Sequence, residues 1–467
     1  MSQHSSSPAA EGPSSPSSCL YQHQHSRRHK PRGNFLSDDQ TRRTNAALAR
    51  QERDRADLLA QIRRIASESI TDEAPEQHAY ADEQTECDDE EHVDVVYEEG
   101  RGGEVGMEED DEQENGDESH ADMAVVEGEG GEKKHQGPSR RARMAARLQV
   151  FRFFAGQLVH PDWLVSPPPD LAHNWLVAAR PEGNRMLVIS KHGWAVARNK
   201  NGRFQMKFPC LLPPRGVTIV DVAFAEATRT MHLLDVLCWN DCLLMDSSTE
   251  CRHFFLKSRY EEMESELRET SVHHMYPMVL VDLHECTQQH LLRLYYEDLD
   301  YPKDSLLFVH KEAHYDPGLN PLWLQWRDAH LSRFAIDTTD PTGKDHPHRE
   351  VGTLQLTKRH NKLKTMDGRI VGAIDDTTRK QHRLKPGQLV KCEMDGIDMD
   401  TMEVQNLMPL GRGPKTRLYP DSFSRLVVQA FMRMDSPPMD FNRILDAIAQ
   451  SHDHEDGAGG GHADMDV

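Results

Sequence analysis

Hydrophobic positions mark out a β-rich region between residues 155 and 410. Short apolar runs alternate there with turn residues, which is the pattern of β-strands. We expect strands at 175–179, 186–189, 194–197, 217–224, 231–239, 253–256, 278–281, 306–309, 352–356 and 388–392. Apolar residues at helical spacing predict helices at 287–296, 422–434 and 442–449. Together these elements predict an α+β fold around a curved antiparallel sheet.

A different pattern occupies residues 27–69, where apolar side chains recur at helical spacing among arginines. A helix with so little apolar surface is marginal on its own in water, so we expect a partner to complete it. The alternative is that it packs on its own domain. The arginines available to an acidic partner or to nucleic acid are Arg42, Arg43, Arg50, Arg53, Arg55, Arg63 and Arg64.

The charge of the chain is concentrated in one segment. Residues 71–132 contain 26 acidic residues and one arginine, whereas the whole chain has a formal net charge of −22. The remainder is therefore slightly basic. We expect residues 70–138 to form a disordered, self-repelling linker, and residues 1–26 and 451–467 to be disordered as well.

Composition also narrows the setting of the protein. The chain has no apolar run of about 18 residues and no signal-peptide pattern, so we expect neither a membrane segment nor secretion. Its eight cysteines lie at scattered spacings that match no zinc-binding pattern. These features predict a reducing, nuclear or cytosolic environment and no metal site.

Candidate binding chemistry lies in the stretch 305–328. A buried strand is followed by turn residues at 315–318, and then by Trp323 and Trp326 beside Arg327. Aromatic faces next to a cation suit a flat purine that carries phosphates, since base stacking contributes about 1 to 3 kcal/mol. The alternative is that both indoles belong to the hydrophobic core.

Several stretches, taken in order, resemble the snurportin family. They are Ala155–Leu158 with Asp162–Leu164, Pro181-x-Gly183-x-Arg185 before Leu187–Ile189, Leu211–Pro213, Leu234–Trp239, and Leu306–Phe308 with His314-Tyr315-x-Pro317-Gly318. Snurportins bind the 2,2,7-trimethylguanosine cap of spliceosomal small nuclear RNAs and carry the particles into the nucleus on importin β. The resemblance implies a cap-binding domain at 139–340, a C-terminal extension at 341–450, and an importin-β-binding segment at 27–69.

The resemblance also implies a set of cap-binding residues. Trp326 would stack on the methylated base, with Trp323 as its rival, and Trp163 would form the apolar wall beside the N2 methyl groups. A cationic N7-methyl purine gains about 0.5 to 2 kcal/mol on an aromatic face. The remaining implied contacts are His160, Pro161, Asn184, Arg185, Met186 and Lys200. Pro161 stands where the family often has a hydroxyl residue, so a side-chain hydrogen bond is lost there.

The implied function is a nuclear import adaptor that shuttles between nucleus and cytoplasm, with capped small nuclear RNA and importin β as partners and no cofactor. Animal members also bind an export receptor through an apolar N-terminal segment. Residues 1–18 contain almost no large apolar side chains, which argues against that route here. A general RNA-cap-binding module without an import role is the first alternative.

An enzyme is the second alternative. The family fold is similar to the nucleotide-binding domain of messenger-RNA capping guanylyltransferases, which need a Lys-x-Asp-Gly nucleophile. The matching place here reads Arg180-Pro181-Glu182-Gly183. Because an arginine stays protonated, it cannot act as that nucleophile, and we expect no enzymatic activity.

Overall fold

The computed structural model describes residues 35–68, 149–332, 350–414, 417–434 and 436–458. The disorder expected at 1–26, at 70–138 and at 459–467 concerns residues outside these ranges. The disordered tail was expected to begin at 451, but residues 451–458 continue a helix instead. We call residues 149–332 the core domain and residues 350–434 the C-terminal module. None of the described helices carries an apolar stretch long enough to cross a bilayer.

The core domain contains two sheets. In the larger sheet the strand order is β5-β4-β3-β6-β7-β8, and β9 pairs in parallel with β7. The strands are β3 (Asn184–Lys191), β4 (Trp194–Asn199), β5 (Phe204–Pro209), β6 (Thr218–Ala225), β7 (Thr230–Trp239), β8 (Cys242–Leu243) and β9 (Met278–Leu280). Apart from the β7–β9 pair, the sheet is antiparallel, and register shifts between β6 and β7 mark bulges that bend it.

The smaller sheet has the order β1-β12-β11-β2-β10, in which β1 and β12 are parallel. Its strands are β1 (Val159–Trp163), β2 (Trp175–Pro181), β10 (His284–Glu285), β11 (Lys303–His310) and β12 (Gly318–Trp326). The helices that accompany the two sheets include α3 (Leu171–Asn174), α4 (Thr249–Glu261), α5 (Glu264–Arg268) and α6 (Gln288–Tyr296), and residues 149–154 are helical as well.

Strand β11 shows why the smaller sheet has continuous apolar runs. Leu306 and Phe308 face one hydrophobic cluster, whereas Leu307 and Val309 face another that lies against the larger sheet. A strand covered on both faces needs apolar residues at every position, not at alternate positions. The smaller sheet is therefore the central layer of the protein.

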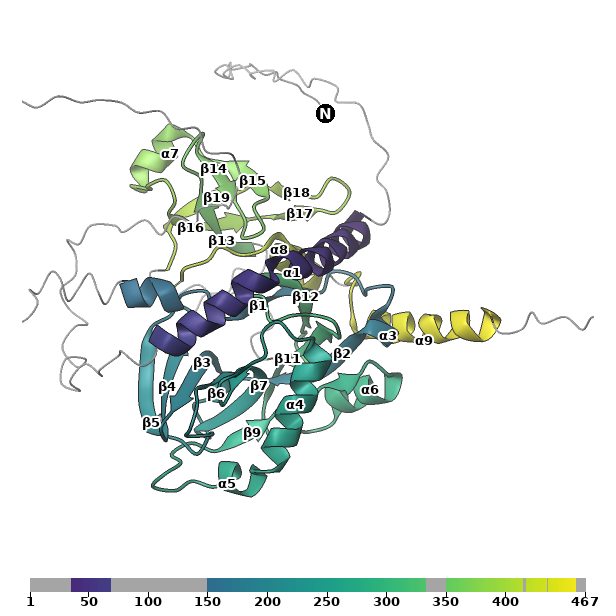
Figure 1. The fold of residues 1–467 in the computed structure, drawn as a ribbon. Coiled ribbons are helices and arrows are strands. Elements are labelled where there is room, and N and C mark those ends of the chain that lie inside the picture. Colours follow the sequence, from purple (N-terminus) through teal and green to yellow (C-terminus); the bar gives the residue numbers. More distant parts are fainter. Residues whose placement is uncertain (1–34, 69–148, 333–349, 415–416, 435, 459–467) are drawn as a thin grey trace, which may run out of the picture.

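The C-terminal module forms a sheet of its own, with the order β15-β14-β13-β16-β19 and a separate hairpin β17–β18. Its elements are β13 (Glu350–Leu356), β14 (Lys362–Lys364), β15 (Ile370–Ala373), α7 (Asp376–Gln381), β16 (Leu389–Met394), β17 (Gly396–Asp398), β18 (Glu403–Gln405), β19 (Met408–Arg412) and α8 (Phe423–Met432). One hydrophobic cluster runs from Trp163 and Phe308 of the core domain to Leu354 and Leu426 of the module. The module is therefore packed onto the core domain, above it in Figure 1.

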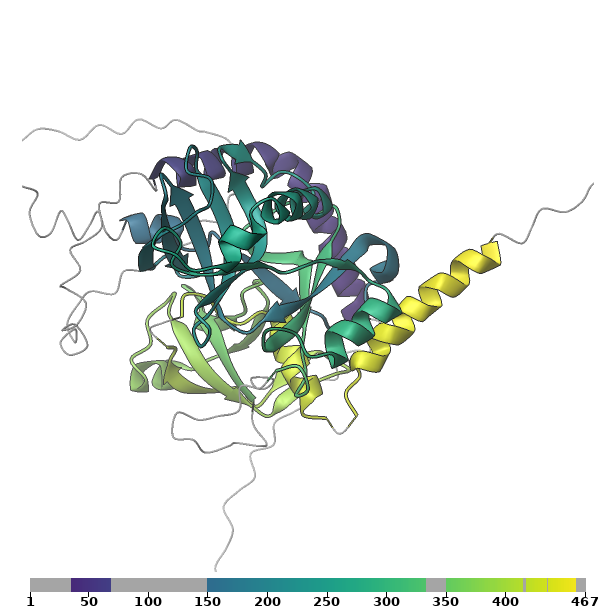
Figure 2. The ribbon, with the colours of Figure 1, turned by 90° about the horizontal axis from the view of Figure 1, so that it is seen from below.

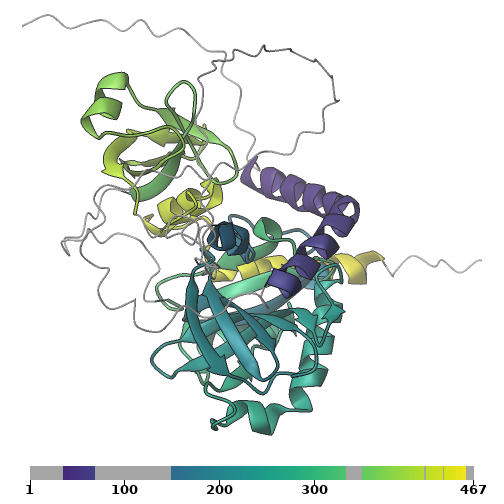
Figure 3. The same cartoon turned by 60° about the vertical axis from the view of Figure 1, so that its left-hand side comes forward.

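Two helices lie outside these units. Helix α1 (Phe35–Glu68) crosses the core domain beside β12, next to the C-terminal module (Figures 1 and 3). Helix α9 (Phe441–Ala458) begins against α3 and α6 and then extends away from the body of the protein (Figure 2).

Helix α1 packs on its own core domain. The expected separate partner is not needed to cover its apolar side chains, and the alternative stated above is the one found. Ala47, Leu58, Ile62 and Ile65 are buried in the same cluster as Trp323. The helix is therefore an integral layer, because its apolar stripe covers the face of the sheet that holds these side chains.

Most other predicted elements are confirmed, with one clear error. Residues 253–256 lie in helix α4, not in a strand. The hydroxyl of Ser248 caps the helix by accepting a hydrogen bond from the backbone of Cys251, and Phe254 in the apolar run is exposed. Trp323 and Trp326, which follow the turn at 315–318, lie within strand β12.

Candidate functional site

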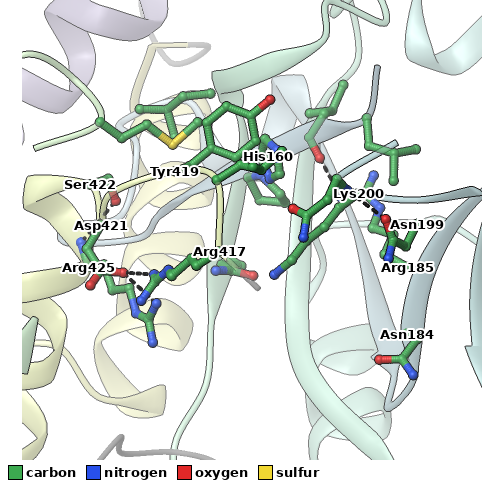
Figure 4. A pocket seen from close by; sticks show the side chains of 18 of the residues that line it. His160, Asn184, Arg185, Asn199, Lys200, Arg417, Tyr419, Asp421, Ser422 and Arg425 are labelled. Atoms are coloured by element: carbon green, nitrogen blue, oxygen red, sulfur yellow. Dashed lines mark hydrogen bonds and ion pairs between the residues drawn. The ribbon is translucent and has the colours of Figure 1, made fainter. Parts of the chain in front are cut away.

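A pocket of about 510 Å³ lies between the core domain and the C-terminal module (Figure 4). Strand β1, the start of β3, the turn after β4 and the end of β12 form its core-domain walls. The segment 417–425, which leads into α8, forms the opposite wall. The site is thus assembled from parts of the chain more than 200 residues apart.

Seven of the residues implied by the snurportin resemblance line this pocket together. They are His160, Pro161, Trp163, Asn184, Arg185, Met186 and Lys200. Trp163 forms an apolar wall and is 6% exposed, and the guanidinium of Arg327 lies 5.0 Å from its ring centre.

Trp326, the implied stacking residue, is not among the residues that line the pocket. Its indole is 2% exposed and lies in a stacked arrangement with Phe441, 6.1 Å away, next to Tyr295. Its rival Trp323 is also 2% exposed and packs edge-on against Tyr315 in the cluster that contains α1. In this structure both indoles are core residues, because strand β12 is covered on both faces.

His160 is held as a neutral ring. Burial, together with the positive charges of Arg185 and Lys200, lowers its pKa to about 3. Its ring centre lies 5.1 Å from that of Tyr419. Among the described residues nothing forms a hydrogen bond with its buried Nε2 atom. The pocket therefore offers an uncharged, unsatisfied imidazole nitrogen.

Arg185 lines the pocket, but its hydrogen bonds point into the protein. Its guanidinium pairs with Asp221 at 2.9 and 2.5 Å and donates to the carbonyl of Val159 at 2.7 Å. Burial alone would lower the pKa of Arg185, but the ion pair with Asp221 outweighs it and the pKa is raised. Arg185 therefore positions β1 against β3 more than it offers charge to a ligand.

Asn184 and Lys200 differ in how free their side chains are. The amide of Asn184 donates to Glu226 at 2.7 Å, which turns it toward the rim. Lys200 follows β4 and is exposed to the pocket. Partial desolvation and the nearby guanidiniums of Arg417 and Arg425 lower its pKa. A bound anion would relieve this repulsion.

Four more cations line the pocket. Arg327 was noted as the cation beside the two tryptophans, whereas Arg180, Arg417 and Arg425 were not predicted as ligands. Arg180 and Arg327 share the carboxylate of Asp304, at 2.7 and 3.1 Å. Arg417 and Arg425 share that of Asp421. With Arg185 and Lys200 they make six cationic side chains for three paired carboxylates. Burial and the charge of Arg327 lower the pKa of Arg425 to about 10, as expected where positive charge is in excess.

The sequence signal for this second wall was the run Arg412 to Tyr419, which mixes basic residues with an aromatic ring. Tyr419 is half-buried, and its ring lies beside that of His160 (Figure 4). Nothing in the local pattern linked this run to residues near position 160. Only the packing of the module brings them together.

Three arginines of α1 form ion pairs with carboxylates from three separate segments of the core domain. Arg43 pairs with Asp162, Arg50 with Asp316 at 3.1 Å, and Arg55 with Asp246 at 2.7 Å. Arg64 lies over the ring of Phe153 at 4.2 Å. The other predicted partner-binding arginines, which are exposed, are Arg42, Arg53 and Arg63.

Residues 157–327 match a protein-family model described as Snurportin1, m3G cap-binding domain. This part of the chain is similar to the snurportin cap-binding domain. The matched residues run from just before β1 to the end of β12, so they include every core-domain wall of the pocket. The wall at 417–425 lies outside the match to the snurportin domain.

Solved structures that resemble this chain include the ligase domain from M. tuberculosis LigD. It is 9% identical, with a TM-score of 0.27, and the match covers 59% of this chain and 98% of that one. A Chlorella virus DNA ligase-adenylate is 10% identical, with a TM-score of 0.26, and the match covers 55% of this chain and 98% of that one.

Proposed function

We propose that the pocket binds the 2,2,7-trimethylguanosine (m3G) cap of RNA. One observation carries the proposal: the same pocket is lined by an excess of positive charge and by uncharged surfaces. Six cationic side chains pair with three carboxylates, and they surround a neutral His160 and the apolar face of Trp163. A triphosphate bridge needs the excess positive charge. A base made cationic by N7 methylation needs an environment without charge repulsion near its ring.

The roles divide along the pocket. Lys200 and the arginines at 417 and 425 face each other across the cavity and suit the phosphates. The neutral Nε2 of His160 suits an edge of the base. Trp163 suits the two methyl groups on N2, since the dimethylated nitrogen has no N–H left to donate. Tyr419 and His160 supply the aromatic faces that Trp326 does not.

Fluorescence titration of the full chain with m3G and monomethylated cap dinucleotides tests this proposal. Lys200→Ala should weaken m3G binding about 5- to 10-fold, as expected for one charge-assisted contact of about 1 to 1.5 kcal/mol. Lys191→Ala, on a lysine that does not line the pocket, is the matched control. Absence of m3G binding would refute the proposal, and equal affinity for the two caps would favour a general cap-binding module.

We propose that the chain binds the cap without chemical change. Arg180 occupies the position of the expected nucleophile and is engaged with Asp304 at 2.7 Å. A protonated guanidinium has no lone pair for attack on a phosphate. Incubation with labelled GTP should leave no adduct that survives denaturation, and a stable adduct would contradict this expectation.

We also propose that α1 links the capped RNA to importin β, so that the protein moves between cytoplasm and nucleus as an import adaptor. The helix carries exposed arginines but is docked on the core domain. Importin β must therefore bind the helix after it has left the core domain. The apparent affinity of importin β equals its affinity for the free helix multiplied by the fraction of molecules in which the helix is released.

Substitutions on the core-domain side test this import role without altering the helix. Arg50 and Arg55 are 46% and 58% exposed, so each pair contributes only about 0.5 kcal/mol. Asp316→Asn with Asp246→Asn should therefore raise importin β affinity about 5-fold. Deleting residues 35–68 should abolish nuclear accumulation of capped RNA, and normal accumulation would leave only the cap-binding role.

A further inference from the structure

A second cavity of about 810 Å³ continues from the pocket along the junction of the core domain and the C-terminal module. The two cavities share the lining residues Leu319, Met366, Leu418, Tyr419 and Pro420. We call this second cavity the trough. A ligand that leaves the pocket past Tyr419 enters the trough directly.

The trough has the surface chemistry of a polyanion site. Its cations are Lys358 and Lys364, and its described lining includes no carboxylate. Among the residues that the structure describes, neither lysine forms an ion pair. Both lie on the C-terminal module: Lys358 is in the turn that joins β13 to β14, and Lys364 is the last residue of β14. Two unpaired ammonium groups on one side of a groove attract a phosphate backbone.

The opposite side of the trough is polar but uncharged. Gln61 of α1 donates to the side chain of Gln157 at 2.6 Å, and both line the trough. Gln355 lines the trough from the module, on the same side as the lysines. Amide groups form hydrogen bonds with base edges, and Tyr419 at the junction provides a half-buried aromatic face for stacking. Cations, amides and an aromatic ring along one groove are the features of a single-strand-binding surface.

We propose that the trough binds the first nucleotides of the RNA chain that follows the cap, with Lys358 and Lys364 on their phosphates. The proposal rests on the cap-binding function proposed above. RNA is favoured over an acidic peptide because the RNA strand is covalently joined to the cap. It must leave the pocket through one of the pocket's openings. The C-terminal module, outside the snurportin match, would then add affinity for capped RNA over free cap.

The experiment compares two probes on the full chain: the m3G cap dinucleotide, and the same cap on a short single-stranded oligonucleotide with a 3′ fluorophore. We expect the capped oligonucleotide to bind about 5- to 10-fold more tightly at low salt. Lys358→Ala with Lys364→Ala should remove that increment and leave dinucleotide affinity within about twofold. The slope of log K against log salt concentration for the oligonucleotide should become shallower by about 1.4, since each of the two single-strand phosphate contacts contributes about 0.7 to it.

Lys362→Ala with Lys380→Ala is the matched control, because these lysines belong to the same module but do not line the trough. Equal wild-type affinity for the two probes would overturn the inference while leaving the cap proposal intact. Retention of the increment in the Lys358 and Lys364 variant would overturn it as well. If the dinucleotide itself does not bind, the cap proposal fails first and the inference falls with it.

Discussion

Replacing Arg43 with alanine should release helix α1 from the core domain, because this side chain compensates a buried charge. Its guanidinium bridges Asp39 of the same helix and Asp162 of β1. Asp162 has no exposed surface, and its other donors are the hydroxyl of Ser424 and the backbone of Trp163 at 2.9 Å. The substitution leaves that carboxylate without its only paired cation among the described residues.

The expected cost follows from the burial of the two groups. Removing one partner of a fully buried pair costs about 3 to 5 kcal/mol. Arg43 is 23% exposed, and two donors to Asp162 remain, so we expect about 2 to 3 kcal/mol. Arg42 is the matched control: it is 74% exposed and pairs only with Asp39, so its replacement by alanine should cost about 0.5 kcal/mol or less.

Hydrogen exchange of backbone amides in α1, followed by mass spectrometry, measures this effect. Loss of 2 to 3 kcal/mol should speed exchange across residues 44–65 about 30- to 150-fold, because exchange reports local opening. A double-mutant cycle isolates the charge pair. In an Asp162→Asn background, Arg43→Ala should cost about 1 kcal/mol or less.

Two results would refute the reasoning. Equal exchange rates in the Arg43→Ala and Arg42→Ala variants would show that the buried carboxylate does not hold the helix. An undiminished effect of Arg43→Ala in the Asp162→Asn background would assign the stabilisation to packing of the arginine stem.

Two further predictions concern buried groups away from α1. Trp326→Ala should lower the free energy of unfolding by about 3 to 5 kcal/mol, because the indole is core and packs on Phe441; a large loss of cap affinity with unchanged stability would instead make Trp326 the stacking residue and require α9 to move. Burial raises the pKa of Glu350 to about 8, so the folded state holds a proton that the unfolded state releases near pH 4.5, and stability should fall as pH rises between these values, by about 3 to 4 kcal/mol. Urea unfolding of Glu350→Gln at pH 5 and pH 8.5 should lack that fall, and parallel profiles for variant and wild type would contradict it.

Local patterns were sufficient for most elements. The apolar runs at 186–189 and 306–309 are strands β3 and β11, and helix α6 begins one residue from its predicted start. The pattern failed at 253–256, because the run belongs to a helix that buries one face only: Leu256 is in the core, whereas Phe254 is exposed. Arg252 on the buried face pairs with Asp235 at 2.8 Å. Polarity along a short run does not report which face is covered.

The binding residues divide in the same way. His160, Trp163 and Lys200 were identified from segments within the snurportin-like part, and the structure places them in one pocket. Arg417 and Tyr419 were missed because their role depends on a module folded more than 200 residues later in the chain. Trp326 was assigned to stacking by the family resemblance, and its burial could not be predicted because Phe441, which covers it, belongs to an element distant in the chain.

By itself the sequence determined that this chain has a basic amphipathic helix, an acidic segment and a β-rich domain, because these depend on neighbouring residues and their periodicity. Its resemblance to snurportins rests on the order of several short motifs. Only the tertiary structure decided that α1 packs on its own domain, that Trp326 is core, and that a C-terminal module closes the pocket. Each of these depends on which surfaces meet, and that is set by packing between residues far apart in the chain.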